Sequence, residues 1–521
     1  MDVALTLVML VGVVVAFGSV ARRIGVAAPL VLIVAGLAIS YVPFLPDVAL
    51  TPDLVLIGLL PPLLYAAAIR TPLIDVRREV RPILGLSVLL VLLTTAVVAL
   101  VAWWVLPIPL AAACAIGAVV APPDAVAATS IARKVGLPRR MVTVLEGESL
   151  LNDATAIVTL RASIAAISGG VTVAGLGWQF VVSGVGGVVI GLAVAVVVGR
   201  IRRRIDDDLT DVAVSFLTPW VAYLPAEEIG ASGVLAVVVA GLVLGHRAPL
   251  IQSASSRVFE RTNWATISFL LENTVFVLIG MQVRTIVDGV RDSDVPYGEV
   301  TLAAVLVLLT VVLVRFVGVF AMIFAPRLVP RARRTEDLAD WRVGLVVGWA
   351  GMRGVVTLAA AFLLPEETPD REVLVMLAFV VTVGTLLVQG LTLPLLVRVL
   401  RIQGPDLAAD RREAAGVLAR ATRAGLVRLD EVVTDDDEPE VVDRLRAQAV
   451  ERAERATTRQ ASEDAVPVGA REYVRLRAEM IEAERAEVLA VRRSGTVDQT
   501  VVATVLDMID AEETVINRRR G

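Results

Sequence analysis

Residues 144–158 read Val-Leu-Glu-Gly-Glu-Ser-Leu-Leu-Asn-Asp-Ala-Thr-Ala-Ile-Val, an apolar helical stretch that carries acids and an amide in its middle. The apolar run around it, residues 141–167, is long enough to cross a bilayer. Asp153 lies 12 residues into this run, about 18 Å along a helix axis and therefore near the midplane. Because a carboxylate at that depth is costly to insert, Asp153 is a candidate functional residue.

The spacing of the polar residues in this stretch places them on two neighbouring faces. Glu148 and Asn152 are four residues apart, as are Ser149 and Asp153, so each pair shares one face of a helix. One face presents a hydroxyl and a carboxylate, and the next presents a carboxylate and an amide. Oxygen ligands of this kind suit a hard cation or a proton.

Composition indicates a polytopic membrane protein with a polar C-terminal tail. Hydrophobic residues make up 56% of the 521 residues, above the 45–50% of a soluble globular chain. The apolar content ends near Arg401, and residues 401–521 carry a net charge of −5 whereas residues 1–400 carry +1. The chain has a single cysteine, so it cannot form an intrachain disulfide. With only one histidine in addition, a His/Cys metal site is not expected. We therefore expect a transmembrane domain over 1–400 and a cytoplasmic helical regulatory tail over 401–521.

Apolar runs separated by charged residues, proline or glycine predict an all-α fold of about 13 transmembrane helices. The predicted spans are 3–20, 27–45, 53–69, 82–106, 109–132, 141–167, 174–199, 209–225, 231–245, 264–287, 299–325, 342–364 and 373–397. Loops on one side of this arrangement hold 21 Lys and Arg residues, and the alternate loops hold three. The positive-inside rule then places the N-terminus outside the cell and the tail in the cytoplasm.

Two of the predicted spans are interrupted. The fifth contains Ala-Pro-Pro-Asp-Ala-Val-Ala at 121–127, and two mid-span prolines break a helix. The twelfth contains Gly-Trp-Ala-Gly-Met-Arg-Gly at 348–354, where three glycines flank Arg353. Interrupted helices at corresponding places in two halves indicate an inverted-repeat transporter, with spans 1–6 and 8–13 as the repeats. If the breaks cross, Asp124 would neutralise helix N-termini and Arg353 helix C-termini.

Other charged residues in the spans have structural as well as functional interpretations. We expect Glu148 and Arg353 to form a buried ion pair that joins spans 6 and 12. Arg161 and Arg315 lie nearer to span ends, which favours side chains that reach out to the interface. Glu272 could line a cavity or pair with a cation, and the sequence favours the structural interpretation. Asp153 and Asp124 could likewise form a structural pair, although their depth favours a function.

Four motifs resemble those of the monovalent cation:proton antiporter-1 family, the sodium/proton exchangers. Gly-Glu-Ser-Leu-Leu-Asn-Asp-Ala at 147–154 is very similar to the family signature, and 121–127 resembles its unwound-helix motif. Leu-Pro-Pro-Leu-Leu-Tyr at 60–65 and the motif at 348–354 match two more. The resemblance covers about residues 1–400. It implies a homodimer with a dimerisation domain and a mobile core domain, no enzymatic activity and no cofactor beyond the transported ions.

The resemblance also assigns a cation site. Asp153 would be the carboxylate that binds cation and proton, and Asp124, the backbone carbonyl of Pro123 and Ser149 would complete the Na⁺ site. Asn152 before Asp153 is the form associated with electroneutral exchange. Two features depart from the pattern. Pro123 stands where Thr is frequent, and Ala66 follows Tyr65 where many members have an acid that could partner Asn152.

These observations predict a secondary Na⁺/H⁺ antiporter of the plasma membrane, working by alternating access in pH and sodium homeostasis. Its partners would be H⁺, Na⁺ (with Li⁺ or K⁺ as alternatives) and the lipid bilayer, with no nucleic acid. A potassium-preferring exchanger is one rival. An intramembrane aspartyl protease is another, but Asp153 and Asp124 lack the Tyr-Asp and Gly-x-Gly-Asp contexts it needs. An uncoupled channel is the third, and proton flux that requires a counter-cation would exclude it.

Overall fold

The computed structural model separates the chain into two compact units, Met1–Gly404 and Pro405–Gly521. It describes residues 2–24, 28–42, 51, 53–124, 136–167, 173–328, 340–402, 404, 407–434, 437–461, 476–477, 479–488, 505–506, 508–509 and 512–513. Within these ranges the regular structure is helical throughout. Each unit is considered by itself.

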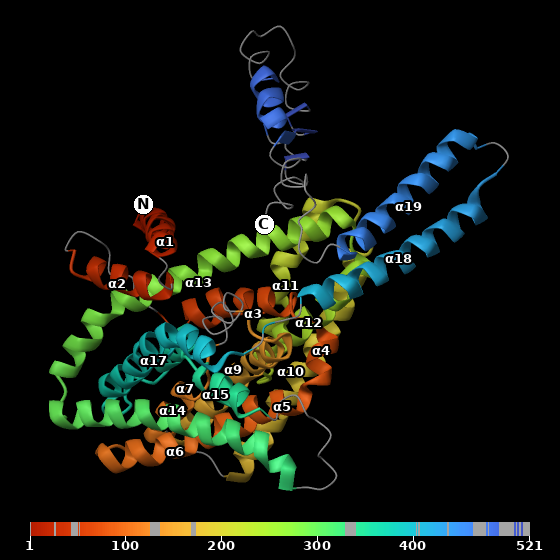
Figure 1. Cartoon of the computed structure of the whole chain (residues 1–521). Coiled ribbons are helices and arrows are strands. Elements are labelled where there is room, and N and C mark those ends of the chain that lie inside the picture. The colour runs from red at the N-terminus through yellow and green to blue at the C-terminus, as the bar shows by residue number, and fades with distance from the viewer. Residues whose placement is uncertain are drawn as a thin grey trace. The chain divides into compact units, whose positions relative to one another are not determined.

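The first unit is a bundle of helices of very different lengths (Figure 1). Its helices are α1 (Asp2–Ile24), α2 (Ala28–Ser40), α3 (Leu60–Ala68), α4 (Leu73–Arg78), α5 (Val80–Leu84), α6 (Leu90–Val105), α7 (Leu110–Val120), α9 (Arg139–Ile167), α10 (Val173–Arg202), α11 (Asp208–Glu228), α12 (Gly233–Ile251), α13 (Ala254–Arg291), α14 (Tyr297–Leu328), α15 (Trp341–Trp349), α16 (Val355–Ala361) and α17 (Arg371–Leu400). Two π-helical turns, η1 (Leu54–Leu59) and η2 (Gly85–Leu89), precede α3 and α6.

Among the described residues, seven helical segments are individually long and apolar enough to cross a membrane. They are Val80–Val105, Arg139–Ile167, Gly177–Arg202, Gly233–Ile251, Ala254–Arg291, Tyr297–Phe324 and Arg371–Leu400. Shorter apolar helices accompany them, which confirms the predicted all-α membrane fold. Helical residues occur in every predicted span, but the number that cross a bilayer stays a prediction, as does the orientation. Residues 125–132, the last eight of the fifth span, lie outside the described part of the chain.

The helix α13 begins ten residues earlier than the hydropathy pattern predicts. Ser253 caps its N-terminus, where the Ser253 hydroxyl accepts a hydrogen bond of 2.9 Å from the Ser256 backbone N–H. The first three turns carry the charged residues Arg257, Glu260 and Arg261, which look like a loop in the sequence. Glu260 is nevertheless buried against neighbouring helices, so tertiary pairing extends the helix beyond its apolar part.

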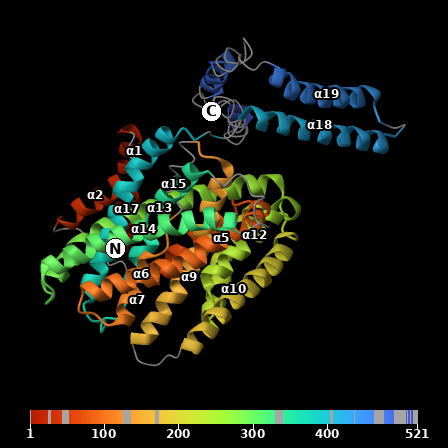
Figure 2. The same cartoon turned by 60° about the horizontal axis from the view of Figure 1, so that its bottom comes forward.

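Glycine allows α2 and α13 to approach closely, side by side in both views (Figures 1 and 2). A methyl group on Gly36 would collide with the Val277 carbonyl, and one on Gly280 would collide with the Ile33 carbonyl. The two backbones are therefore in direct contact at this crossing, as small residues permit in membrane helix packing.

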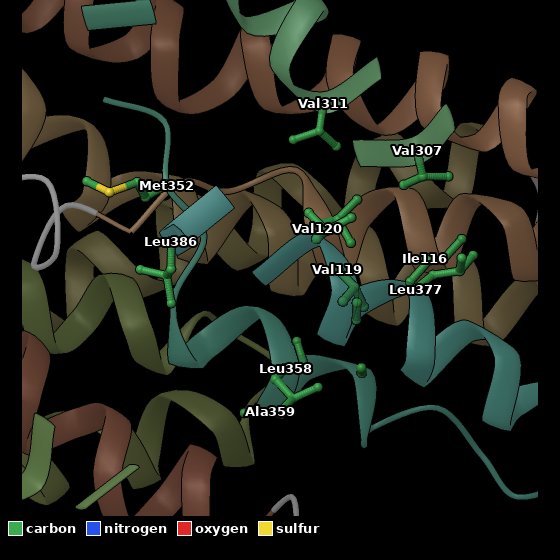
Figure 3. Close-up of a cluster of buried hydrophobic side chains, with 14 of the residues drawn as sticks. Ile116, Val119, Val120, Val307, Val311, Met352, Leu358, Ala359, Leu377 and Leu386 are labelled. Carbon is green, nitrogen blue, oxygen red and sulfur yellow. The ribbon is translucent and has the colours of Figure 1, made fainter. Parts of the chain in front are cut away.

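The helix α9 occupies the interior of the bundle, where it packs against α5, α6, α7 and α12 (Figure 2). Beside it, a large apolar core joins the end of α7 to α14 and α17. Figure 3 shows Val119 and Val120 of α7 near Leu377 of α17, with Met352 between α15 and α16 beside Leu386. These residues are almost completely buried. The core therefore packs directly against both interrupted segments.

The second unit contains α18 (Leu407–Val432) and α19 (Pro439–Ala461), which pack against each other. Arg446 and Asp430 join them through an ion pair of 2.8 Å. The sequence predicts helices over 406–433 and 441–459, and Asp430 and Arg446 lie in the first and the second of these ranges. Of the third predicted piece, 471–493, residues 476–477 and 479–488 are described and helical. The regulatory role of this tail stays a prediction.

Replacing Gly280 with alanine should destabilise the protein by about 1–3 kcal/mol, because the new methyl group overlaps the Ile33 backbone. Helix propensity alone would give the opposite sign, since alanine exceeds glycine by about 1 kcal/mol in a helix interior. Gly12→Ala is the matched control, because Gly12 of α1 has open space around it. Thermal unfolding of the purified variants in detergent measures both. Equal stability of the two variants would contradict the close crossing.

Candidate cation site

Two interruptions of helical backbone lie against each other. The helix α7 ends at Val120, and residues 121–124 continue without helical structure. Residues 350–354 separate α15 from α16 in the same way. The Asp124 backbone N–H donates a hydrogen bond of 2.7 Å to the Met352 carbonyl, which joins the two breaks directly. Sequence reasoning predicted both breaks, and the described residues show that they meet.

Arg353 binds the carbonyl end of α7. Its Nε donates to the Val120 carbonyl at 3.0 Å and its Nη2 to the Ala121 carbonyl at 3.1 Å. Its Nη1 donates to the Gly351 carbonyl, and its backbone N–H donates to the Thr385 hydroxyl at 2.9 Å. A cation at a helix C-terminus satisfies carbonyls that have no partner within the helix. Arg353 therefore occupies the C-terminal position that the sequence predicts for it.

The predicted ion pair between Glu148 and Arg353 is wrong. Glu148 of α9 pairs with Arg315 of α14, whose Nη1 and Nη2 donate to the two carboxylate oxygens at 2.6 and 3.0 Å. The side chains are 1% and 2% exposed, so Arg315 does not reach out to the interface as its position near a span end suggested. The Arg353 guanidinium binds the backbone carbonyls at the end of α7. Glu148 therefore pairs with the guanidinium of Arg315.

Glycine at two positions of the second break makes room for these charges. A methyl group on Gly351 would collide with the Arg315 side chain. One on Gly354 would collide with the Asp124 carboxylate, which lies against the backbone just before α16. The glycines flanking Arg353 thus serve close approach as well as the interruption of the helix.

The two candidate carboxylates lie close together in the interior. Asp153 of α9 is 7% exposed, and its neighbour Asn152 contacts the carbonyl of Pro123, the residue before Asp124. Ser149 lies one helical turn before Asp153 on the same helix. The fold therefore brings Asp153 and Asp124 together from segments separated in the sequence.

Asn152 contacts the first break through its side chain. Its Nδ2 donates a hydrogen bond of 2.7 Å to the Pro123 carbonyl, the atom that the resemblance assigns as a cation ligand. The amide oxygen of Asn152 is buried and has no hydrogen-bond partner among the residues that the structure describes. A carbonyl oxygen has two lone pairs, so the Pro123 carbonyl retains capacity for a second partner.

A narrow pocket opens between α9, α14 and the two breaks. It is lined by Pro123, Asp124, Leu145, Glu148, Ser149, Arg315 and Ala350. Three of the predicted site residues, Pro123, Asp124 and Ser149, thus share one pocket. Asp153 and Asn152 lie outside its lining.

Sequence reasoning missed a buried polar cluster at the ends of α10, α11 and α13. Arg202 donates to both oxygens of Asp211 at 2.7 and 2.9 Å, and it pairs with Glu260 at 3.0 Å. Gln252 donates to both acids, at 3.0 and 2.9 Å. The signal was weak because Arg202 belongs to a basic run, Arg-Ile-Arg-Arg-Arg at 200–204, which reads as a solvated loop.

Hydroxyl groups complete this cluster. Ser256 donates to Asp211 and Ser215 donates to Glu260, while the Trp264 indole N–H donates to the Ser215 hydroxyl at 3.0 Å. Both carboxylates are therefore saturated with donors, which suits a structural junction between helices. At the other end of α11, Arg161 pairs with Glu227 at 2.6 Å while its side chain stays 41% exposed.

An all-helical membrane bundle whose interrupted helices meet beside buried carboxylates has the architecture of an ion-coupled secondary transporter. The family model for the transmembrane part of sodium/hydrogen exchangers matches residues 7–399. The chain therefore belongs to the sodium/hydrogen exchanger family, as the motifs predicted. The prediction that it is not an enzyme is confirmed, and members of this transporter family need no cofactor beyond the transported ions.

Known relatives match over most of their length. An uncharacterised Na⁺/H⁺ exchanger of Mycobacterium tuberculosis is 34% identical over 97% of this chain and 95% of its own length. The uncharacterised exchanger YjcE of Escherichia coli is 29% identical over 94% of both chains. The sodium/proton antiporter MjNhaP1 of Methanocaldococcus jannaschii shares the fold, with a TM-score of 0.61 and 17% identity over 76% of this chain and 99% of its own.

Arg315→Met should lower the free energy of unfolding by about 3–5 kcal/mol, because it leaves Glu148 buried without a partner. Combining it with Glu148→Gln should cost less than the sum of the two single changes. The control is a second double-mutant cycle with Glu148→Gln and Arg353→Met. The coupling free energy between Glu148 and Arg353 should be the smaller of the two. Thermal-stability cycles in detergent compare the two. Stronger coupling to Arg353 than to Arg315 would contradict the pairing described here.

Proposed function

We propose that this exchanger is an electroneutral Na⁺/H⁺ antiporter of the plasma membrane in which cation and proton compete for Asp153. The observation that carries the proposal is the placement of Asp153, buried on α9 beside Asp124. Competition for one carboxylate couples two opposed fluxes, because either ion neutralises Asp153 and the two cannot bind together. A single site of this kind, exposed alternately to the two sides, needs no further coupling device.

Asp124 and Asp153 take different roles in this proposal. Asp124 lies against Gly354 directly before α16, where the positive end of a helix favours a negative charge. It stays ionised through the cycle. Asp153 lies in the middle of α9, away from helix ends, so its charge is compensated by the bound proton or by the bound cation.

Ser149 and the Pro123 carbonyl supply neutral oxygens beside Asp124. Oxygen donors of this mixed kind suit Na⁺, a hard cation. The Asn152 amide holds the Pro123 carbonyl when no ion is bound, and the carbonyl accepts the cation through its free lone pair.

The proposal also covers the oligomeric state, the orientation in the membrane, the physiological role and the transported cation. We expect a homodimer with the N-terminus outside and the tail in the cytoplasm, serving pH and sodium homeostasis. Na⁺ is the first choice of cation. A relative from Bacillus subtilis, 30% identical over 76% of this chain, carries the name of a sodium, potassium, lithium and rubidium/H⁺ antiporter. Potassium and lithium therefore belong in any assay.

Asp153→Asn should abolish cation-dependent proton flux in reconstituted vesicles while the protein remains folded. The amide cannot carry the charge that binds either ion. Asp288→Asn on α13, an exposed position, is the matched control and should transport normally. In the parent protein, flux should fall at low pH, where protons displace Na⁺, and at high pH, where Na⁺ is not displaced. Residual Na⁺-dependent flux in Asp153→Asn would reject Asp153 as the exchanging carboxylate.

An imposed membrane potential should not change the initial rate of exchange, because one Na⁺ moves for each H⁺. The measurement uses a potassium diffusion potential set with valinomycin, after K⁺ transport by the protein has been tested. Rates with inside-negative, zero and inside-positive potentials should agree. Clear acceleration by one sign of potential would show unequal exchange and would assign a second titrating group, with Asp124 as the first candidate.

A further inference from the structure

Gln389 of α17 is a buried amide whose polar atoms are not paired. It is 1% exposed, and among the described residues neither its Oε1 nor its Nε2 has a hydrogen-bond partner. Thr382 and Thr385, buried on the same helix, donate to the carbonyls of Ala378 and Val381, each at 2.8 Å. Burying a polar group without a partner costs stability, so an amide in this condition calls for a physical reason.

The neighbours of Gln389 on α17 bind both ends of the second break. The Thr385 hydroxyl accepts a hydrogen bond of 2.9 Å from the Arg353 backbone N–H. The Thr392 hydroxyl accepts one of 2.8 Å from the indole N–H of Trp349, the last residue of α15. Positions 385, 389 and 392 are four and three residues apart, so they share one face of the helix. Gln389 therefore faces the break between its two ends.

The backbone of the break carries groups that suit this amide. Figure 3 shows Met352, in the middle of the break, beside Leu386 of α17. Met352 is fully buried, and its carbonyl accepts the Asp124 N–H from the first break. Within the described ranges, the backbone N–H groups of Gly351 and Met352 make no hydrogen bond. Unsatisfied backbone donors and an unsatisfied side-chain amide thus belong to two segments that pack against each other.

The bond between Asp124 and Met352 ties the candidate cation site to this backbone. A movement of Asp124 as an ion binds or leaves would release the Met352 carbonyl. A released carbonyl in the interior of a membrane protein is costly unless another donor replaces the lost one. The amide of Gln389 has two N–H donors and a carbonyl oxygen, so it can replace that donor and accept from a neighbouring N–H at the same time.

We propose that Gln389 is a positioning residue that binds the backbone of the second break when the bond between Asp124 and Met352 opens during transport. Its Nε2 then donates to the Met352 carbonyl, and its Oε1 accepts from a backbone N–H of the break. The inference rests on the proposed exchange at Asp153 and concerns the conformational step. Gln389 is not among the residues that line the pocket beside Asp124, so it acts on the rate of rearrangement and not on cation binding.

This role explains why the amide is unpaired in the arrangement described here. An unpaired amide raises the free energy of this arrangement, and its pairing lowers the free energy of the rearranged one. The difference between the two states is therefore smaller than it would be with an apolar side chain at position 389, and interconversion is faster.

The test compares Gln389→Met with Thr382→Val and the parent protein, measuring thermal unfolding in detergent and Na⁺-dependent proton flux in vesicles. Gln389→Met removes the unpaired amide at similar volume, so Tm should rise. Its maximal rate should fall about threefold to tenfold, with KM for Na⁺ within about twofold of the parent. Thr382→Val alters an equally buried side chain of α17 whose hydroxyl is already satisfied. Its Tm should not rise, and its maximal rate should stay within about twofold.

A higher Tm in Gln389→Met with an unchanged maximal rate would overturn the proposal, because the amide would then have no role in the cycle. A lower Tm would show that the amide is already bound in the resting protein and would overturn it equally. Failure of both Gln389→Met and Gln389→Leu to fold counts as that second result. These outcomes leave exchange at Asp153 intact, whereas absence of cation-dependent flux in the parent protein would reject the proposed function and this inference with it.

Discussion

The contact between the two interrupted helices is the constraint on which the rest of the site depends. An interrupted helix exposes carbonyl and N–H groups that a bilayer cannot satisfy, so breaks are tolerated only where protein or a water-lined cavity covers them. Here each break satisfies the other. The Asp124 N–H binds the Met352 carbonyl, and Arg353 binds the Val120 and Ala121 carbonyls. The apolar core of α7, α14 and α17 packs against this junction (Figure 3).

The charged side chains around this junction are buried, so neighbouring helices must supply charges of opposite sign. Arg315 neutralises Glu148 inside the pocket that Asp124 and Ser149 line. Farther along the bundle, Arg202 is shared between two donor-saturated acids and ties α10, α11 and α13 together. Breaking either arrangement would leave a buried charge without a partner, which costs several kcal/mol. The buried arginines Arg315 and Arg202 thus stabilise the packing of the helices and engage Glu148, Asp211 and Glu260 in ion pairs.

The two breaks and the candidate carboxylates could be located from the sequence because their signals are local. Proline and glycine inside apolar runs predicted the breaks, and the depth of Asp153 singled out that residue. The partner of Glu148 could not be predicted, because Arg315 lies 167 positions away and linear position favoured a surface role. The start of α13 was missed for a related reason. Its charged first turns read as a loop until the fold pairs Glu260 with Arg202.

Charge balance links this frame to the stoichiometry of exchange. Glu148 and Arg315 cancel within the pocket. At the junction, Asp124 lies at the start of α16 and Arg353 lies at the end of α7, so these two charges offset helix ends of opposite sign. In the described part of the chain, Asp153 has no ion pair or helix end to compensate its charge. Moving the site through a low-dielectric interior while Asp153 is ionised and holds no ion would cost free energy. One bound proton or one bound Na⁺ neutralises that charge. Each arrangement of the loaded site then carries the same total charge, which is the physical reason to expect one-for-one exchange.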